Sequence, residues 1–189
     1  GTLFTAANSN TPMILTAGQQ EQGHGLMEPL LYGPLVEMAA KIARINQGEL
    51  VGVNITVLPN VTAYTDAEPF LEEVKEVMYQ AQKIALHNRV PFSSLIKISR
   101  SVGPELLKIS REQKCNLILM GYLQEGEPLE NSGINSLVQH QPCDVAILKT
   151  EHLECRPFRR VIMPVGGKII HDRLKVRLLH SISKTDGCP

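Results

Sequence analysis

Short, almost continuously apolar runs alternate along this chain with longer segments in which apolar side chains recur every three or four residues. The short runs are rich in β-branched residues and end at Gly, Pro or polar clusters, which is typical of strands buried on both faces of a sheet. We predict five such strands, at Met13–Ala17, Leu50–Val57, Phe92–Ile98, Asn116–Met120 and Val145–Leu148.

Amphipathic helices are predicted between these strands. The clearest begins near Asp66, a candidate N-cap, and carries one apolar stripe from Phe70 to Ala85 with charged residues on its other side. Further helices are predicted at Leu35–Ala43, Ser101–Ile109 and Ser132–Val138. Alternating strands and helices require right-handed crossovers, so the sequence predicts a doubly wound α/β fold around a parallel sheet.

The pattern begins again near the C-terminal end of the sequence. The run Val161–Gly166 repeats Met13–Gly18, and Leu174–Gly187 repeats Leu35–Gly48. We interpret this restart as the first βα unit of a second copy. Because one such unit cannot bury its own apolar face, we expect it to pack on the first domain or on a second chain, and we expect the natural protein to continue beyond it.

These boundaries divide the chain into four parts. Residues 1–11 are interpreted as a linker or an expression scar, 12–150 as the complete domain, 151–159 as a linker and 160–189 as the partial repeat. No apolar stretch reaches the roughly 20 residues that a membrane-spanning helix needs. We find no signal peptide either, and we therefore expect a cytoplasmic location.

The charge balance disfavours one class of partner. The chain has 19 basic and 19 acidic residues and a formal net charge of zero. Binding to a polyanion needs a local excess of cations, so we expect no nucleic-acid partner.

No catalytic constellation is apparent in the sequence. The GxGxxG, GxSxG and HExxH motifs are absent, and Gly166-Gly-Lys168 lacks the remaining residues of a phosphate-binding loop. The pairs His140/Cys143 and His152/Cys155 lack the two further ligands that a zinc site requires. Cys143 is predicted to be a small core residue, and the cysteines to be thiols. We predict that the chain is not an enzyme and holds no metal.

Several segments, in their order along the chain, resemble the universal stress protein family. They are Ile96–Arg100, Leu117–Tyr122 and Asn131–Ile147, and the restart Arg160–Gly167 resembles the opening strand of a following domain in tandem members. The turn Met-Gly-Tyr and the run Pro-Cys-Asp-Val resemble domains appended to the cytosolic C-termini of bacterial and archaeal amino-acid permeases and cation/proton antiporters. The resemblance covers about Pro12–Lys149.

This resemblance implies a Rossmann-like, adenine nucleotide alpha hydrolase-like sheet of five parallel strands in the order 3-2-1-4-5, often dimeric through the fifth strand. ATP-binding members place an Asp after strand 1 and a Gly-x-x-Gly-x9-Gly-Ser/Thr loop after strand 4, at the crevice where these two strands end. Here Gly18 stands at the Asp position and Gln124 at the second glycine, so the loop is degenerate. The residues expected nearest to ATP or AMP are Gly18, Ile55, Gly121, Gly126 and Ser132.

Three functional interpretations remain open. The favoured one is a non-catalytic regulatory or stress-response domain with a degenerate nucleotide-binding loop, at the cytosolic face of the membrane as part of a transporter. The second is an assembly or dimerisation module without a ligand. The third is a stand-alone universal stress protein that binds ATP or AMP and has weak hydrolase activity. The expected partners are a second copy of the chain and the transmembrane part of a transporter.

Overall fold

The computed structural model describes residues 2–4, 12–17, 32–57, 68–99, 101–122, 137, 139–140, 143–149, 157–164 and 172–187. Five of the described strands and four of the described helices coincide with predicted elements. In chain order the elements are β1 (Thr2–Phe4), β2 (Pro12–Ala17), α1 (Tyr32–Ile45), β3 (Glu49–Val57), α2 (Glu68–His87), β4 (Phe92–Ser99), α3 (Val102–Glu112), β5 (Leu117–Tyr122), β6 (Asp144–Lys149) and α5 (Asp172–Asp186). Of the short helix predicted after Ser132, Leu137 and Gln139 are helical and most of the remainder lies outside the described residues.

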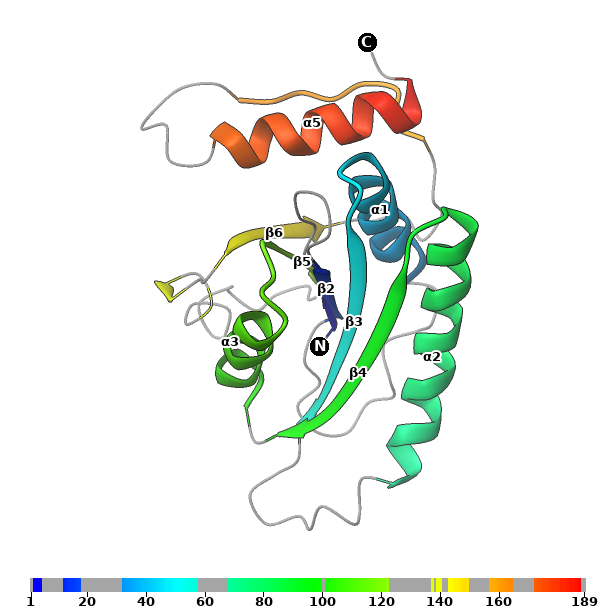
Figure 1. Ribbon diagram of the computed structural model, residues 1–189, viewed down its shortest axis with the longest axis vertical. Coiled ribbons are helices and arrows are strands. Elements are labelled where there is room, and N and C mark those ends of the chain that lie inside the picture. The colour runs from blue at the N-terminus through cyan, green and yellow to red at the C-terminus, as the bar shows by residue number, and fades with distance from the viewer. Residues whose placement is uncertain are drawn as a thin grey trace.

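The predicted strands pair in parallel throughout. β4 pairs with β3, β3 with β2, β2 with β5, and β5 with β6. Figure 1 shows α2 and α3 on opposite sides of the layer that contains β3 and β4. An α/β fold with parallel strands and helices on both faces is therefore confirmed.

Two apolar clusters fill the two faces of this sheet. Leu50 and Leu117 belong to the cluster formed with α1 and α2, whereas their neighbours Val51 and Ile118 belong to the cluster formed with α3. Successive side chains of a strand point to opposite faces, so a strand covered on both sides must be apolar at every position. This is why the strands read as continuous apolar runs.

Within the described residues the sheet has six strands rather than the five predicted. The additional strand, β1, lies in the segment interpreted as a linker or scar, and it pairs antiparallel with both β3 and β5. Pairing of β2 with β3 ends at Leu15 and Gly52, and β1 pairs with the next two residues, Val53 and Asn54. The backbone groups of β3 beyond its pairing with β2 need hydrogen-bond partners, and β1 supplies them.

The C-terminal segment contains the predicted helix but not, in its described part, the predicted strand. α5 falls on the helix predicted at Leu174–Gly187, and Gly187 follows it with a φ of 68°, the left-handed conformation that favours glycine. Residues 161–164 pair with no strand, and Ile162 is 84 % exposed. Pro164 lacks an N–H group for a ladder, which disfavours pairing there. Of the two arrangements expected for this tail, packing on the first domain or on a second chain, the structure shows the first, because Leu174 joins the core cluster of α1.

Candidate nucleotide site

The carboxyl ends of β2 and β5 lie side by side. Ala17 is the parallel partner of Gly121, and the loops that follow these two strands therefore begin at adjacent points. From β2 the chain continues through α1 to β3 on one side, and from β5 it continues to β6 on the other. A crevice forms where crossovers leave in opposite directions, which is where ligands bind in open α/β sheets.

The structure describes two of the five residues predicted to line this crevice. Gly121 lies in β5 at its rim, and Ile55 lies in β3. Ile55 is only 2 % exposed and packs in the cluster on the α3 side. Its side chain therefore serves the core in this structure. Gly18, Gly126 and Ser132 lie outside the described residues.

Gly121 has a packing role that is independent of any ligand. A β-carbon at this position would lie 3.2 Å from Cδ2 of Leu35, in the first turn of α1. The missing side chain lets α1 begin close to the end of β5. Leu35 fills the space that a side chain at this position would take, so the observed role of the glycine is this close packing.

A pair of polar side chains at the carboxyl end of β3 escaped the sequence analysis. Asn54 is 8 % exposed, and the hydroxyl of Thr56 donates a hydrogen bond to its Oδ1 over 3.2 Å. The two residues are separated by one position on the strand, so their side chains lie on the same face of the sheet. Polar side chains at these positions of a buried strand are the signal that could have singled them out, since buried polar groups cost free energy unless they are bonded.

β1 lies beside the middle of β3 and of β5. It pairs with Val53 and Asn54 of β3 and with Leu119 and Met120 of β5, two to four residues before the carboxyl ends of these strands.

The described strand ends at this crevice offer binding chemistry rather than acid–base chemistry. The last residues of β2, β3 and β5 in the described part include no Asp, Glu, His or Cys. Nor do three His, Cys, Asp or Glu side chains come together to hold a metal ion among the described residues. What this part of the site provides is backbone groups, an amide and a hydroxyl.

Cys143 lies at the other end of the sheet and is not activated. It directly precedes β6, whose carboxyl end borders the crevice side. Burial, and to a smaller extent the neighbouring Cys115 and Asp144, raise the pKa of its thiol to about 12 against the opposing effect of Arg177. Both cysteines carry thiols in the structure. A nucleophilic cysteine needs a lowered pKa, so this environment favours the predicted core role.

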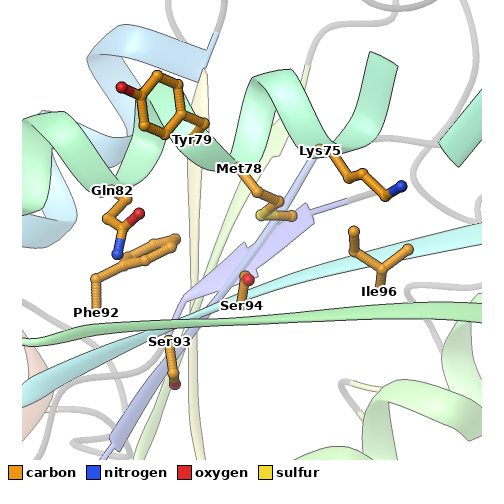
Figure 2. Close-up of a pocket in the computed structure, with 8 residues that line it drawn as sticks. All are labelled: Lys75, Met78, Tyr79, Gln82, Phe92, Ser93, Ser94 and Ile96. Atoms are coloured by element: carbon orange, nitrogen blue, oxygen red, sulfur yellow. The ribbon is translucent and has the colours of Figure 1, made fainter. Parts of the chain in front are cut away.

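A hollow of about 350 Å³ lies elsewhere, between α2 and β4. Figure 2 shows Met78, Phe92 and Ile96 between the helix and the strand, while Ser93 points away from the helix. This hollow lies at the β4 edge of the sheet, opposite to the β6 edge, and none of the predicted site residues lines it. It gives no support to the predicted nucleotide site.

The fold and these strand ends define a doubly wound α/β protein whose crossovers diverge between β2 and β5. The sequence pattern of the Universal stress protein family matches residues 33–149, more than half of the chain. The chain therefore belongs to the universal stress protein family.

Two solved structures of this family share the fold. One is the universal stress protein from Archaeoglobus fulgidus in complex with dAMP, with a TM-score of 0.50 and 13% identity, covering 75% of this chain and 97% of that one. The other is a universal stress protein in complex with cAMP, with a TM-score of 0.53 and 13% identity, covering 77% of this chain and 100% of that one.

A curated relative is a transporter. The chain is 26% identical over 135 residues to the Na(+)/H(+) antiporter NhaS5 of Synechocystis sp., which covers 69% of this chain but only 19% of the antiporter. The chain thus spans about a fifth of that relative. Within the described residues, no helix has the length and the apolar character that crossing a membrane requires.

Proposed function

We propose that this chain is a non-catalytic regulatory domain at the cytosolic face of a membrane transporter of the cation-antiporter type. The similarity to a Na(+)/H(+) antiporter carries this proposal, because it extends over 135 residues, about the size of one universal stress protein domain. A domain of that size within a much longer protein is suited to sensing a signal rather than to transport itself. The described strand ends, which lack acid–base groups, support a role without catalysis.

The reading frame that encodes the chain tests its attachment to a transporter. We expect a series of apolar segments, each of about 20 residues, upstream of the codon for Gly1. A start codon immediately before Gly1 would contradict the attachment and favour a stand-alone universal stress protein.

The ligand that we propose for the crevice is a nucleoside monophosphate such as AMP. Two proteins of the same fold bind dAMP and cAMP, and Gly121 lies at the end of β5 beside the end of β2, where the crevice forms. The segment after β5 carries Glu125, Glu127 and Glu130. Their negative charges repel phosphate groups, and the repulsion grows with the charge of the ligand. ATP should therefore bind more weakly than AMP.

Calorimetric titration of the chain with AMP and ATP tests this ligand. We expect heat from AMP and an affinity for ATP that is roughly tenfold lower, as a few units of like charge at close range predict. The triple substitution Glu125→Gln, Glu127→Gln and Glu130→Gln should reduce the difference between the two nucleotides.

Three exposed glutamates elsewhere on the domain provide the control. Neutralising Glu72, Glu76 and Glu112 changes the net charge equally and should leave the preference for AMP unchanged. If neither AMP nor ATP produces heat, the result would favour the assembly module without a ligand. Tighter binding of ATP than of AMP would overturn the electrostatic argument.

The second candidate function, dimerisation through β6, also has structural support. Among the described strands β6 pairs only with β5, and its Ile147 is 39 % exposed. An unpaired edge with an apolar side chain is suited to pairing with another copy. Light scattering should then report twice 20.9 kDa, and Ile147→Lys should reduce it to the monomer. A monomer for the unsubstituted chain would exclude this interface.

We also propose that the parallel strands follow the complete family order and that the C-terminal segment opens a second copy. The four parallel pairings support the complete family order 3-2-1-4-5, with β1 as an addition. The support for a second copy is the sequence repeat and the position of its helix, α5.

A further inference from the structure

The apolar stripe of α5 packs against the first domain. Figure 1 shows the helix lying across α1. Leu174 is 9 % exposed and Ser181 is fully buried, and Leu178 and Ile182 pack against the cluster that contains α1. Leu174, Leu178 and Ile182 recur every four residues and so form one side of the helix. Val176, which is not part of this stripe, is 64 % exposed. In this arrangement the stripe cannot also cover a second sheet.

Asp186 ties three parts of the chain together at the end of α5. Its Oδ1 lies 2.6 Å from Nζ of Lys41 in α1, and its Oδ2 accepts a hydrogen bond of 2.9 Å from the backbone N–H of Phe158. The Asp186 side chain is only 2 % exposed and that of Lys41 15 %. A carboxylate so far removed from water is tolerated only when both its oxygens have partners, and here both do.

Two more polar contacts hold the helix along its length. The amide of Asn46, just beyond α1, donates to the hydroxyl of Ser181 over 3.1 Å. Further towards the start of α5, Nη2 of Arg177 reaches Oδ1 of Asn116, which precedes β5, at 3.5 Å. The contacts of α5 thus extend from the end of α1 to the start of the central strands.

The position of α5 follows from a gap in the covering of the sheet. The crossovers from β2 to β3 and from β3 to β4 place α1 and α2 on one face. Ala146 and Leu148 of β6 also face this side and pack against the same cluster, at the far end from α2. A third helix beside α1 completes the covering of this face.

We propose that the outer side of α1 is a docking surface for one amphipathic helix, and that its occupant is α5 of the same chain. The described residues 157–164 and 172–187 then form a clasp that closes the first domain, and the ion pair of Asp186 with Lys41 holds it in place. The helix that the sequence repeat marks as the opening of a second copy serves as the last helix of the first. This role concerns the stability of the domain and is independent of the nucleotide proposal.

Hydrogen exchange of the full chain, read by mass spectrometry, tests the clasp. Lys41→Gln and Asp186→Asn each remove one partner of the buried pair and leave the other charge uncompensated. We expect exchange in residues 172–186 to accelerate roughly tenfold or more in each variant, while exchange in β3 stays unchanged. Lys175→Gln is the control, since among the described residues Lys175 pairs only with Asp172 of its own helix, at 3.7 Å, and both are partly exposed.

Two results would overturn the proposal. One is unchanged exchange in α5, or acceleration that is equal in α5 and β3, because α5 would then not be a separately fastened element. The other is exchange in α5 of the unsubstituted chain that slows with increasing protein concentration, because the helix would then dock on another copy. A specific acceleration in both variants, independent of concentration and absent from Lys175→Gln, supports docking within one chain.

Discussion

Iodoacetamide should alkylate Cys143 in the folded chain roughly a thousandfold more slowly than an ordinary cysteine at neutral pH. The pKa of this thiol is raised from 9.0 to about 12, mainly by burial, so the reactive thiolate is scarcer by that factor. Mass spectrometry of the alkylated peptide measures the rate. The matched control is the same residue in urea, where the unfolded chain should react at the ordinary rate. Rapid labelling of folded Cys143 would contradict the described environment and reopen a nucleophilic role.

The same raised pKa predicts how stability depends on pH. In the unfolded chain Cys143 deprotonates near its ordinary value of 9.0, whereas in the folded chain it stays protonated up to about 12. The folded state therefore binds the proton more tightly, and its advantage is complete below pH 9 and lost as the pH rises towards 12. Urea unfolding at a series of pH values should show this decline, and Cys143→Ala should remove part of it. A decline of equal size in that variant would assign it to other groups.

Replacing Gly52 with valine should destabilise the domain by about 3 kcal/mol, as overpacking of a well-filled core does. A β-carbon at this position would lie 2.6 Å from Cζ of Phe92 and 3.1 Å from Sδ of Met78. The ring of Phe92 occupies the space that the glycine leaves between β3 and α2. Urea unfolding monitored by circular dichroism gives the free energy.

A second substitution separates this clash from a general intolerance of β3. Phe92→Leu shortens the side chain that meets the new β-carbon, so combining it with Gly52→Val should cost less than the sum of the two single changes. Gly121→Ala is a milder comparison, because its β-carbon would meet only the flexible end of Leu35, at 3.2 Å. Strict additivity of the two changes at Gly52 and Phe92 would show that the ring is not the obstacle.

The central strands were predictable because burial on both faces leaves a strong pattern. The predicted run Leu50–Val57 became β3, and Asn116–Met120 became most of β5. β1 could not be predicted, since three residues are too few to show a period of two and their pairing depends on where β2 ends. The run at 161–164 has the apolar character of a strand, but a strand is stable only beside a partner, and composition does not reveal whether one is available.

The helix ends show a similar limit. Gly48 follows α1, yet the residue with the left-handed backbone is Gln47, with a φ of 54°, and Gly48 donates its N–H to the carbonyl of Ala43. The chain leaves α2 and α3 in the same way, with a left-handed backbone at Arg89 and at Lys114, two residues beyond each helix. Glycine is preferred at such positions but not required, so a rule based on glycine alone misplaces these ends by one residue or more.

The adjacency of the ends of β2 and β5 at the candidate site was predictable, but the burial and bonding of the side chains there were not. The family resemblance placed the crevice at β2 and β5, and the pairing of Ala17 with Gly121 agrees with adjacent strand ends. The burial of Ile55 and the bonded pair of Asn54 and Thr56 depend on which face of β3 each side chain takes. That assignment requires knowledge of what covers each face, which a single sequence does not contain.

α1 connects the rim of the candidate site with α5. Its fourteen residues form a rod about 21 Å long. Leu35 in its first turn touches the end of β5, and Lys41 and Asn46 near its other end hold α5. A helix transmits an axial force along its length, so a load applied at Gly187 by a tether or fusion partner would pass through α5 and its partners Lys41 and Asn46 into α1 and arrive at the rim beside Gly121.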